Sequence, residues 1–226
     1  MKGTLANTAA VLLGSAIGLA AGRRIPERFK EILMQCLGLS TLFLGIQMAL
    51  SGRDAIPAVG ALLLGAVTGE ALRLEAVMEG LGRWLKERSG SSSSTFVEAF
   101  VTTSLLYCTG AMVIVGSIQD GTTGDATTLY MKSLLDGVAS VAFASTLGIG
   151  VAFSALTVLV VQGALTLLAS HLAFLQGPAV MGAITATGGL IIMGIGLNLL
   201  HLTRIPIGNL VPALVYAVIY AVLWAT

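Results

Sequence analysis

The sequence predicts an all-α, polytopic membrane protein. Hydrophobic residues make up 56% of the chain and charged residues only 10%, whereas about a quarter of the residues in a soluble domain are charged. The apolar residues are gathered into stretches of roughly 20, and a helix of that length crosses the hydrocarbon core of a bilayer. Strands of a membrane barrel would be shorter and would alternate polar with apolar residues, which these stretches do not. We expect a single transmembrane domain, residues 1–226, with about eight helices in contact with the lipid bilayer.

Polar stretches separate the apolar runs and set the expected ends of the helices. The first run has no clear cleavage site before Arg23, so we expect a retained helix rather than a secretory signal. Residues 73–88 are amphipathic, which is typical of a helix in the membrane interface, and residues 89–94 have the composition of a flexible linker. Asp125 is placed to cap the fifth helix. The spans are expected at about residues 1–22, 32–50, 58–72, 95–116, 126–147, 151–169, 180–200 and 209–224.

An internal repeat is expected between the first three spans and the last three. Sliding the chain by 149 residues places Gly14 on Gly163 and Gly45 on Gly194 without gaps. Five crossings separate the starts of the two units, so they would enter the membrane from opposite sides. Inverted repeats of this kind recur in secondary transporters, with the substrate site near the midplane. The predicted parts are repeat one (1–75), the amphipathic segment and linker (76–94), a central helix pair (95–149) and repeat two (150–226).

Basic residues in two connections predict the orientation. The connections after spans one and three lie on the same side of the membrane if every span crosses. By the positive-inside rule that side is the cytoplasm, so both termini are expected outside. These basic residues are Arg23, Arg24, Arg28, Lys30, Arg73, Arg83, Lys86 and Arg88.

Residues 116–137 concentrate polar chemistry between two apolar spans. Asp136 lies eleven residues after Asp125, about 16 Å along a helix and hence close to the middle of the membrane. Lys132 is one turn before Asp136 on the same face. The functional interpretation is a carboxylate that binds and releases a cation or proton, and the structural alternative is a Lys132–Asp136 bridge that fixes helix packing.

Other polar residues could complete a binding site. Asp120 and Asp125 are expected in a glycine-rich loop, which is either solvated or re-entrant. Five neutral polar residues lie in or at the ends of the repeated spans, where each makes an interhelical hydrogen bond or all together line a pathway: Asn7, Gln47, Gln162, Asn198 and Asn209. The predicted binding residues are Asn7, Gln119, Asp120, Asp125, Lys132, Ser133, Asp136, Ser140 and Asn209.

Several classes of function are not indicated by the sequence. The signatures of zinc proteases, serine hydrolases, P-loop proteins and dinucleotide-binding enzymes are missing. The net charge of +1 gives no argument for nucleic-acid binding, and the two cysteines do not have the spacing of a metal site. We expect no enzymatic activity, no cofactor, no bound metal and no nucleic-acid partner.

Four stretches resemble one family of membrane proteins. They are GTLANTAAVLLGSAIG, IPERFKEILMQCLGLSTLFLGIQMAL, the central GSIQDG..GD...L..KS.LDG..S..FAS and IPIGNLVPAL. Across nearly the whole chain the sequence is similar to the domain of unknown function 554 family, the YqgA-like proteins. The resemblance implies a multi-pass protein of a prokaryotic cytoplasmic membrane, often described as a transporter without an assigned substrate. It assigns no role to any of the predicted binding residues.

The favoured function is a transporter or channel for an ion or small polar solute. Carboxylates outnumber the single lysine of the central stretch, which indicates a cationic solute. An amine, a metal ion and a proton-coupled neutral solute all fit this pattern. The alternative is a structural or regulatory membrane protein that acts as an assembly partner. The four-residue glycine spacing in the first span would also suit a homodimer or larger assembly.

Overall fold

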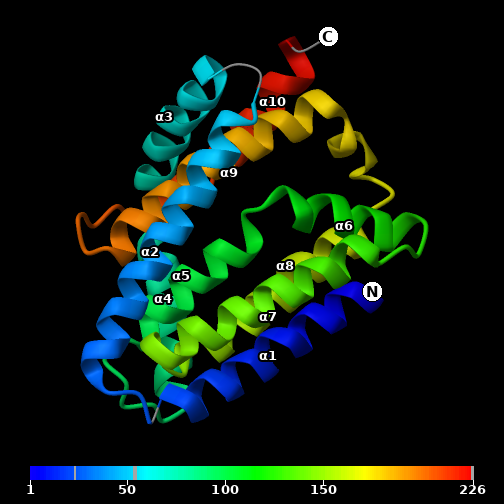
Figure 1. The fold of residues 1–226 in the computed structure, drawn as a ribbon. Helices are drawn as coiled ribbons and strands as arrows, with labels where there is room; N and C mark the ends of the chain where they lie inside the picture. The colour runs from blue at the N-terminus through cyan, green and yellow to red at the C-terminus, as the bar shows by residue number, and fades with distance from the viewer. Residues whose placement is uncertain (23, 53–54, 225–226) are drawn as a thin grey trace. The chain divides into compact units, whose positions relative to one another are not determined.

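The computed structural model describes residues 1–22, 24–52 and 55–224, and every regular element in these ranges is a helix (Figure 1). Arg23 of the predicted basic connection lies outside the described residues. The all-α prediction is confirmed for the described part of the chain. Its elements are α1 (Lys2–Gly22), α2 (Glu27–Leu50), α3 (Ala55–Leu72), α4 (Leu74–Arg88), α5 (Phe96–Cys108), α6 (Ala111–Thr122), α7 (Thr127–Leu147), α8 (Gly150–Leu167), η1 (Ala173–Gln176), α9 (Pro178–Leu199), η2 (Ile207–Leu210) and α10 (Ala213–Trp224).

The length and surface of the helices identify a membrane protein. Within the described ranges, α1, α2, α3, α8 and α9 are each long and apolar enough to cross a membrane, and the bent pair α5–α6 makes a sixth if it is one span. Large apolar side chains face outward, including Leu13 (66% exposed), Ile56 (85%) and Val67 (71%). Such a surface is stable in lipid and would aggregate in water. The protein is therefore a polytopic helical membrane protein, while the predicted count of eight spans also needs α7 and α10 to cross and stays a prediction.

The helices pack into two compact units, each assembled from three segments of the chain. Helices α2 and α4 each have one end in unit 1 and the other in unit 2. Helices that the predicted repeat makes equivalent belong to the same unit. Helices α1 and α8 form one such pair, in unit 1. In unit 2 the pairs are α3 with α10, and α9 with the greater part of α2. Unit 1 comprises Met1–Gln35, Glu79–Cys108 and Met112–Ala173, and unit 2 comprises Cys36–Met78, Thr109–Ala111 and Phe174–Thr226.

Glycines bring α1 into close contact with α7 in unit 1. A Cβ atom at Gly14 would lie 2.2 Å from the carbonyl oxygen of Gly137, and one at Gly18 would lie 2.3 Å from that of Val141. Only glycine therefore allows the two backbones to approach this closely. The residue numbers rise together along the contact, so α1 and α7 run parallel. The glycines that recur every four residues in α1 thus serve helix packing within the chain.

Helix α8 runs antiparallel to α1. Hydrogen-bonding atoms of Thr4 and Thr166 lie 3.2 Å apart, and those of Asn7 and Gln162 lie 2.9 Å apart. Along this contact the residue numbers of α1 rise while those of α8 fall. Helix α5 packs against α8 as well, and its Phe96 ring lies 5.1 Å from a ring of α8. The buried apolar cluster between α1, α5 and α8 consists of Val11, Tyr107, Ala155 and Val158.

The fourth span was predicted as one continuous helix over residues 95–116, and this prediction is wrong. Helix α5 ends at Cys108 and α6 begins at Ala111, and the two are bent by 61°. Thr109 and Gly110 lie in the break. The predicted loop around Asp120 is also wrong, because that residue lies in the last turns of α6.

Unit 2 is built on antiparallel pairs of helices. Gly38 lies against Leu200 and Gly45 against Met193, so α2 and α9 run in opposite directions. Helix α3 packs in the same way against α10 and the short helix η2 before it. Close contact again depends on glycine, since a Cβ atom at Gly45 would lie 2.6 Å from the backbone nitrogen of Met193.

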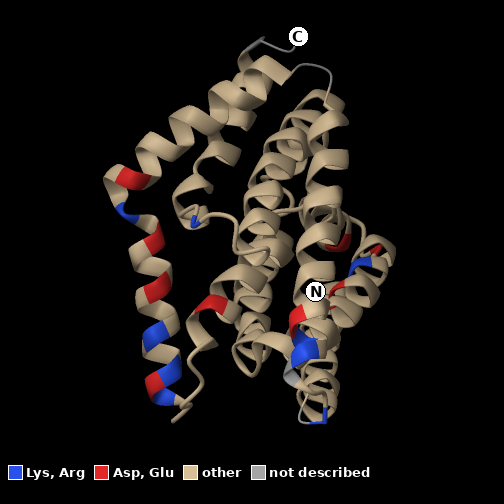
Figure 2. Cartoon of the chain, turned by 60° about the vertical axis from the view of Figure 1, so that its left-hand side comes forward, with Lys and Arg blue, Asp and Glu red and all other residues tan. Residues whose placement is uncertain are grey.

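Helix α4 carries the predicted amphipathic segment. Figure 2 shows charged residues crowded along α4, while long lengths of the other helices carry none. Leu85 is buried, whereas Glu79 and Arg83 form an exposed ion pair one turn apart. The helical structure is confirmed, and its position in the membrane interface stays a prediction.

Candidate functional site

A buried ion pair lies near the middle of α7. Lys132 Nζ is 2.5 Å from Asp136 Oδ2, four residues on in the same helix, and the two residues are only 6% and 7% exposed. The ring of Tyr107, from α5, lies with its centroid 5.9 Å from the ammonium nitrogen. Burying two charges costs more free energy than one contact recovers, so such a pair needs further polar partners.

Helix α1 supplies those partners through Asn7. Its Nδ2 donates hydrogen bonds to Asp136 Oδ2 and to Gln162 Oε1, both at 2.9 Å. Gln162 Nε2 in turn donates to Thr4 Oγ1 at 3.4 Å, and the hydroxyl oxygens of Thr4 and Thr166 lie 3.2 Å apart. These contacts follow one face of α1. The Oδ1 atom of Asn7 is buried and has no hydrogen-bond partner.

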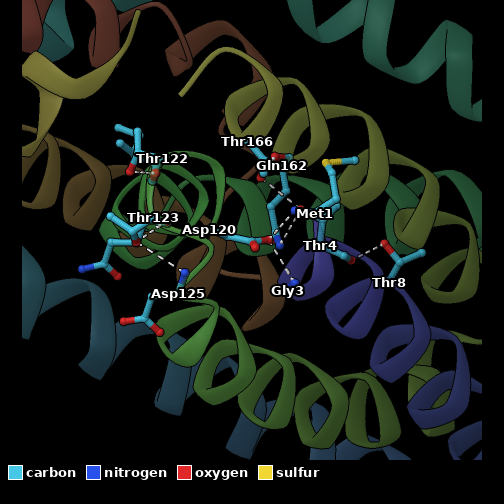
Figure 3. Close-up of polar contacts among 12 residues, drawn as sticks. Met1, Gly3, Thr4, Thr8, Asp120, Thr122, Thr123, Asp125, Gln162 and Thr166 are labelled. Atoms are coloured by element: carbon cyan, nitrogen blue, oxygen red, sulfur yellow. Dashed lines mark hydrogen bonds and ion pairs between the residues drawn. The ribbon is translucent and has the colours of Figure 1, made fainter. Parts of the chain in front are cut away.

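A second buried carboxylate lies at the N-terminal end of α1 (Figure 3). Asp120 Oδ2 accepts a hydrogen bond from the Gly3 backbone N–H at 3.0 Å and lies 2.9 Å from the amino group of Met1. The first N–H groups of a helix have no partner within the helix and carry partial positive charge, so a carboxylate is stabilised there. Asp120 therefore holds the end of α6 to the start of α1.

The two carboxylates lie along one side of α1. Gly3, which contacts Asp120, is four residues before Asn7, which contacts Asp136, so the contacts are about 6 Å apart along the helix axis. Side chains of α8 provide amide and hydroxyl groups in the same region. We define the polar strip as Thr4, Asn7, Asp120, Lys132, Asp136, Gln162 and Thr166.

Gln119 and Asp125 are two of the five predicted binding residues outside the polar strip, and they lie at the adjoining ends of α6 and α7. The Oε1 atom of Gln119 accepts a hydrogen bond from the Thr128 hydroxyl at 2.7 Å. Asp125 is exposed, and its Oδ1 accepts a hydrogen bond from the Thr127 backbone N–H at 3.0 Å. Asp125 thus stabilises the first turn of α7, although Ala126 rather than Asp125 occupies the cap position itself.

Asp125 gives a pH-dependent contribution to stability. Hydrogen bonds from the hydroxyl and the backbone N–H of Thr127 hold the pKa of Asp125 below its ordinary value of 3.8. A carboxyl group whose pKa is lower in the folded state stabilises the fold above its unfolded pKa, and this contribution is lost as the pH falls through the folded pKa. We expect Asp125→Ala to lower the melting temperature at neutral pH and the difference from wild type to vanish in acid. A difference that persists in acid would contradict this assignment.

Ser133 and Ser140 share the face of Asp136 but differ in their contacts. The Ser133 hydroxyl donates to the carbonyl oxygen of Leu129 in its own helix at 2.7 Å. The Ser140 hydroxyl lies 2.8 Å from the Tyr107 hydroxyl of α5, and both groups are buried. Ser140 therefore joins α7 to α5, whereas Ser133 joins α7 to no other helix through this bond.

This difference predicts unequal effects of two identical substitutions. Ser140→Ala leaves the Tyr107 hydroxyl buried without this partner and is expected to cost about 1–3 kcal/mol of unfolding free energy. Ser133→Ala is the matched control and is expected to change it by less than about 0.5 kcal/mol. Thermal unfolding of the purified variants in detergent measures both. Equal effects would show that the bond between Ser140 and Tyr107 does not hold α5 to α7.

Asn209 belongs to a different cluster, in unit 2. Its Nδ2 donates to Glu70 Oε2 at 2.7 Å, and its Oδ1 accepts from the Glu75 backbone N–H at 2.7 Å. The Gly208 N–H donates to the Glu75 carboxylate. These bonds join η2 to the end of α3 and the start of α4. Asn209 thus belongs to unit 2, whereas the other predicted binding residues belong to unit 1.

Four contacting residues were not among the predicted site residues. Gln162, Thr4 and Thr166 continue the polar strip, and Tyr107 lies beside Lys132 and Ser140. The signal for three of them is helical spacing. Gln162 and Thr166 are four residues apart in α8, and Thr4 is three residues from Asn7 in α1, so each pair shares one face of an otherwise apolar helix.

The polar strip brings carboxylates, amides, hydroxyls and an ammonium group into the interior of a helical bundle. Groups of these types can coordinate a cation or relay a proton, and they are rare in membrane-spanning regions without a role. The fold and the site together define a polytopic helical membrane protein with a buried, charged polar strip.

The comparisons with known proteins assign the family. The model of the family described as "Protein of unknown function (DUF554)" matches residues 2–222, and the chain belongs to this family. The chain is 31% identical to "Uncharacterized protein YqgA" of Escherichia coli (strain K12), over 98% of this chain and 97% of that protein. It is 32% identical to "Uncharacterized membrane protein YdfK" of Bacillus subtilis (strain 168), over 95% of this chain and 93% of that protein. No solved structure is significantly similar to the chain. The resemblance found in the sequence is confirmed.

Proposed function

We propose that this protein is a transporter that moves a small cation or small cationic solute across the membrane, with the polar strip as its binding region. The observation that carries the proposal is the Asp136 carboxylate, which lies buried near the middle of the 21-residue helix α7 and binds both Lys132 and Asn7. A buried carboxylate at membrane depth is costly, and such residues commonly mark ion pathways.

The geometry of the ion pair argues against a purely structural role. Lys132 and Asp136 belong to one helix, so their contact ties α7 to no other element. A structural bridge that fixed helix packing would join two helices. The bond from Asn7 to Asp136 does join α1 to α7, but an amide pair could do the same without burying two charges. The charges therefore favour a function over packing.

The broken pair α5–α6 supports the same proposal. The break follows Tyr107 and Cys108, and the Tyr107 hydroxyl contacts Ser140, one turn beyond Asp136 on α7. Discontinuous helices are typical of transporters, where they surround the substrate near the midplane. A hinge of this kind next to the charged pair could alter access to Asp136.

The directions of the helices favour eight crossings and an inverted repeat. Each pair of helices that the shift of 149 residues makes equivalent runs antiparallel, and each pair meets near equivalent positions. Gly45 contacts Met193, the neighbour of its counterpart Gly194, and Gly65 contacts Ala213, the neighbour of its counterpart Leu214. A local two-fold relation within each pair would produce these contacts. In unit 1, α1 runs parallel to α7 and antiparallel to α8, as the first, fifth and sixth of eight alternating spans would.

The remaining expectations belong to the same proposal. The protein would lie in the cytoplasmic membrane of a prokaryote with both termini outside, because the basic connections after α1 and α3 would face the cytoplasm. It would work as a homodimer or larger homo-oligomer, and not as an enzyme. Its partners would be lipid and the transported solute.

Uptake into proteoliposomes tests the proposal. The full chain is reconstituted, and uptake of labelled methylammonium, sodium and potassium is compared with that of protein-free liposomes. The matched control is Lys132→Met/Asp136→Asn, which removes both charges of the pair and leaves no unpaired charge. We expect uptake of at least one of these cations by wild type and its loss in the double variant.

The opposite result would favour the alternative function. If wild type takes up none of the probes above the protein-free background, the proposal fails for these cations. Altered complex formation by the double variant in native membranes, without any uptake by wild type, would instead identify an assembly partner.

A further inference from the structure

Lys132 occupies a position that fits a free cation. Its ammonium group is bound by Asp136 Oδ2 and lies within 5.9 Å of the ring centroid of Tyr107. A carboxylate with an aromatic ring nearby is a usual environment for a bound ammonium group. Because Lys132 reaches this position from the same helix as Asp136, the contact does not fix the packing of α7 on its neighbours.

The Asn7 amide that binds Asp136 also carries an acceptor without a partner. Its Nδ2 binds Asp136, while the Oδ1 atom of the same amide group is buried without a partner. Buried polar atoms are nearly always hydrogen-bonded, and an exception needs an explanation. A ligand with several N–H donors could bind Asp136 and Asn7 Oδ1 together.

Lys132 can leave this position in one direction. It is five residues from the start of α7, about 7.5 Å along the axis, whereas Asp136 is nine residues from it, about 13.5 Å. Helical side chains tilt toward the N-terminus of their own helix, but Lys132 is bent the other way to reach Asp136. A lysine stem is long enough to carry its ammonium group back toward the exposed residues before α7. The Asp136 carboxylate is too short to follow.

We propose that Lys132 is a tethered occupant of a cation site formed by Asp136, Asn7 and Tyr107, and that a monovalent, ammonium-type cation takes its place. The inference rests on the proposed function and adds the ligand class and the exchange. One positive charge replaces another, so Asp136 stays neutralised whichever cation is bound. A divalent cation would leave an excess charge beside the single Asp136 carboxylate. The face of Tyr107 and the free Asn7 Oδ1 favour a cation with N–H donors.

Removing the tethered ammonium group tests the exchange. Thermal unfolding of the full chain in detergent is followed against methylammonium chloride, with tetramethylammonium chloride as the control for charge and ionic strength. A tethered group competes at an effective concentration of about a millimolar or more. We therefore expect Lys132→Met to be stabilised by methylammonium at roughly tenfold lower concentration than wild type. Tetramethylammonium, which has no N–H donor, should not stabilise it.

Control variants separate this inference from general effects of charge. Lys86→Met makes the same substitution on α4, where the side chain is partly exposed, and should respond to methylammonium as wild type does. Lys132→Met/Asp136→Asn lacks the carboxylate and should show no response. If Lys132→Met cannot be purified in a folded form, Lys132→Gln removes the charge, and the same comparison applies.

The outcomes distinguish this inference from the proposed function. An affinity of Lys132→Met for methylammonium that is equal to or weaker than that of wild type overturns the exchange, even if uptake depends on Asp136. A tighter affinity in Lys132→Met without any uptake by wild type supports the cation site and contradicts transport. Tighter binding that persists in the double variant places the cation elsewhere and overturns the inference.

Discussion

Asp136→Asn is expected to lower the free energy of unfolding by about 3–5 kcal/mol, the largest single effect in the polar strip. The substitution preserves the shape of the side chain but removes the charge that compensates the Lys132 ammonium group. Since Lys132 is only 6% exposed, its ammonium group would lose its ionic partner where it lies, and would either stay buried and unpaired or leave its packed position. Chemical or thermal unfolding of purified protein in detergent measures the change.

Two comparisons show whether burial of the charge is the cause. Lys132→Met/Asp136→Asn removes both charges and is expected to recover most of the loss, because neutral replacement of a buried pair is often tolerated. Glu79→Gln breaks an exposed pair of the same spacing, in which Arg83 lies 3.1 Å away, and is expected to cost less than about 0.5 kcal/mol. If Asp136→Asn is no more harmful than Glu79→Gln, then Lys132 readily finds water and the pair is not buried in the membrane protein.

Apolar runs located most of the long helices well. Helices α1, α3, α7, α8 and α9 begin and end within three residues of the predicted spans. Their ends are marked by glycine, proline or polar residues, which is the information that a sequence holds locally. Helix α2 begins at Glu27, five residues before the predicted span. The first turn of α2 is charged, so hydropathy placed the start of the span too late. Hydropathy locates the part of a helix that fits in lipid and not the helix itself.

The break between α5 and α6 could not be predicted in this way. Residues 95–116 form one apolar run, and a single glycine such as Gly110 is common in unbroken membrane helices. The helical state of Asp120 was missed for another reason, since its glycine-rich neighbours suggested a loop.

Among the contacts of the candidate site, only the one within α7 itself could be predicted, although Asn7 and Asp120 were also predicted as binding residues. Lys132 and Asp136 are one turn apart, so their contact follows from helix geometry alone. Their contact with Asn7 depends on which face of α1 meets α7, and the bond from Asn7 to Gln162 depends on α8 as well. A single sequence does not contain these pairings. The pairing of Asn209 with Glu70 in unit 2 shows the same limit, because its polarity alone suggested membership of the site.

Gly14→Ala is expected to destabilise the protein by about 1–3 kcal/mol and to weaken the site at the same time. The added Cβ atom would lie 2.2 Å from the Gly137 carbonyl oxygen, so α1 must move away from α7. Asn7 is on the same face of α1 and holds Asp136 at 2.9 Å, a hydrogen bond that such a movement would lengthen. The matched control is Gly163→Ala, at the position that the predicted repeat would make equivalent, where the nearest atom to the new Cβ is 3.7 Å away. Gly163→Ala should keep the melting temperature within the range of a neutral substitution and leave the methylammonium response unchanged. If Gly14→Ala behaves like Gly163→Ala in both measurements, then α1 is not packed tightly against α7, and Asn7 does not position Asp136.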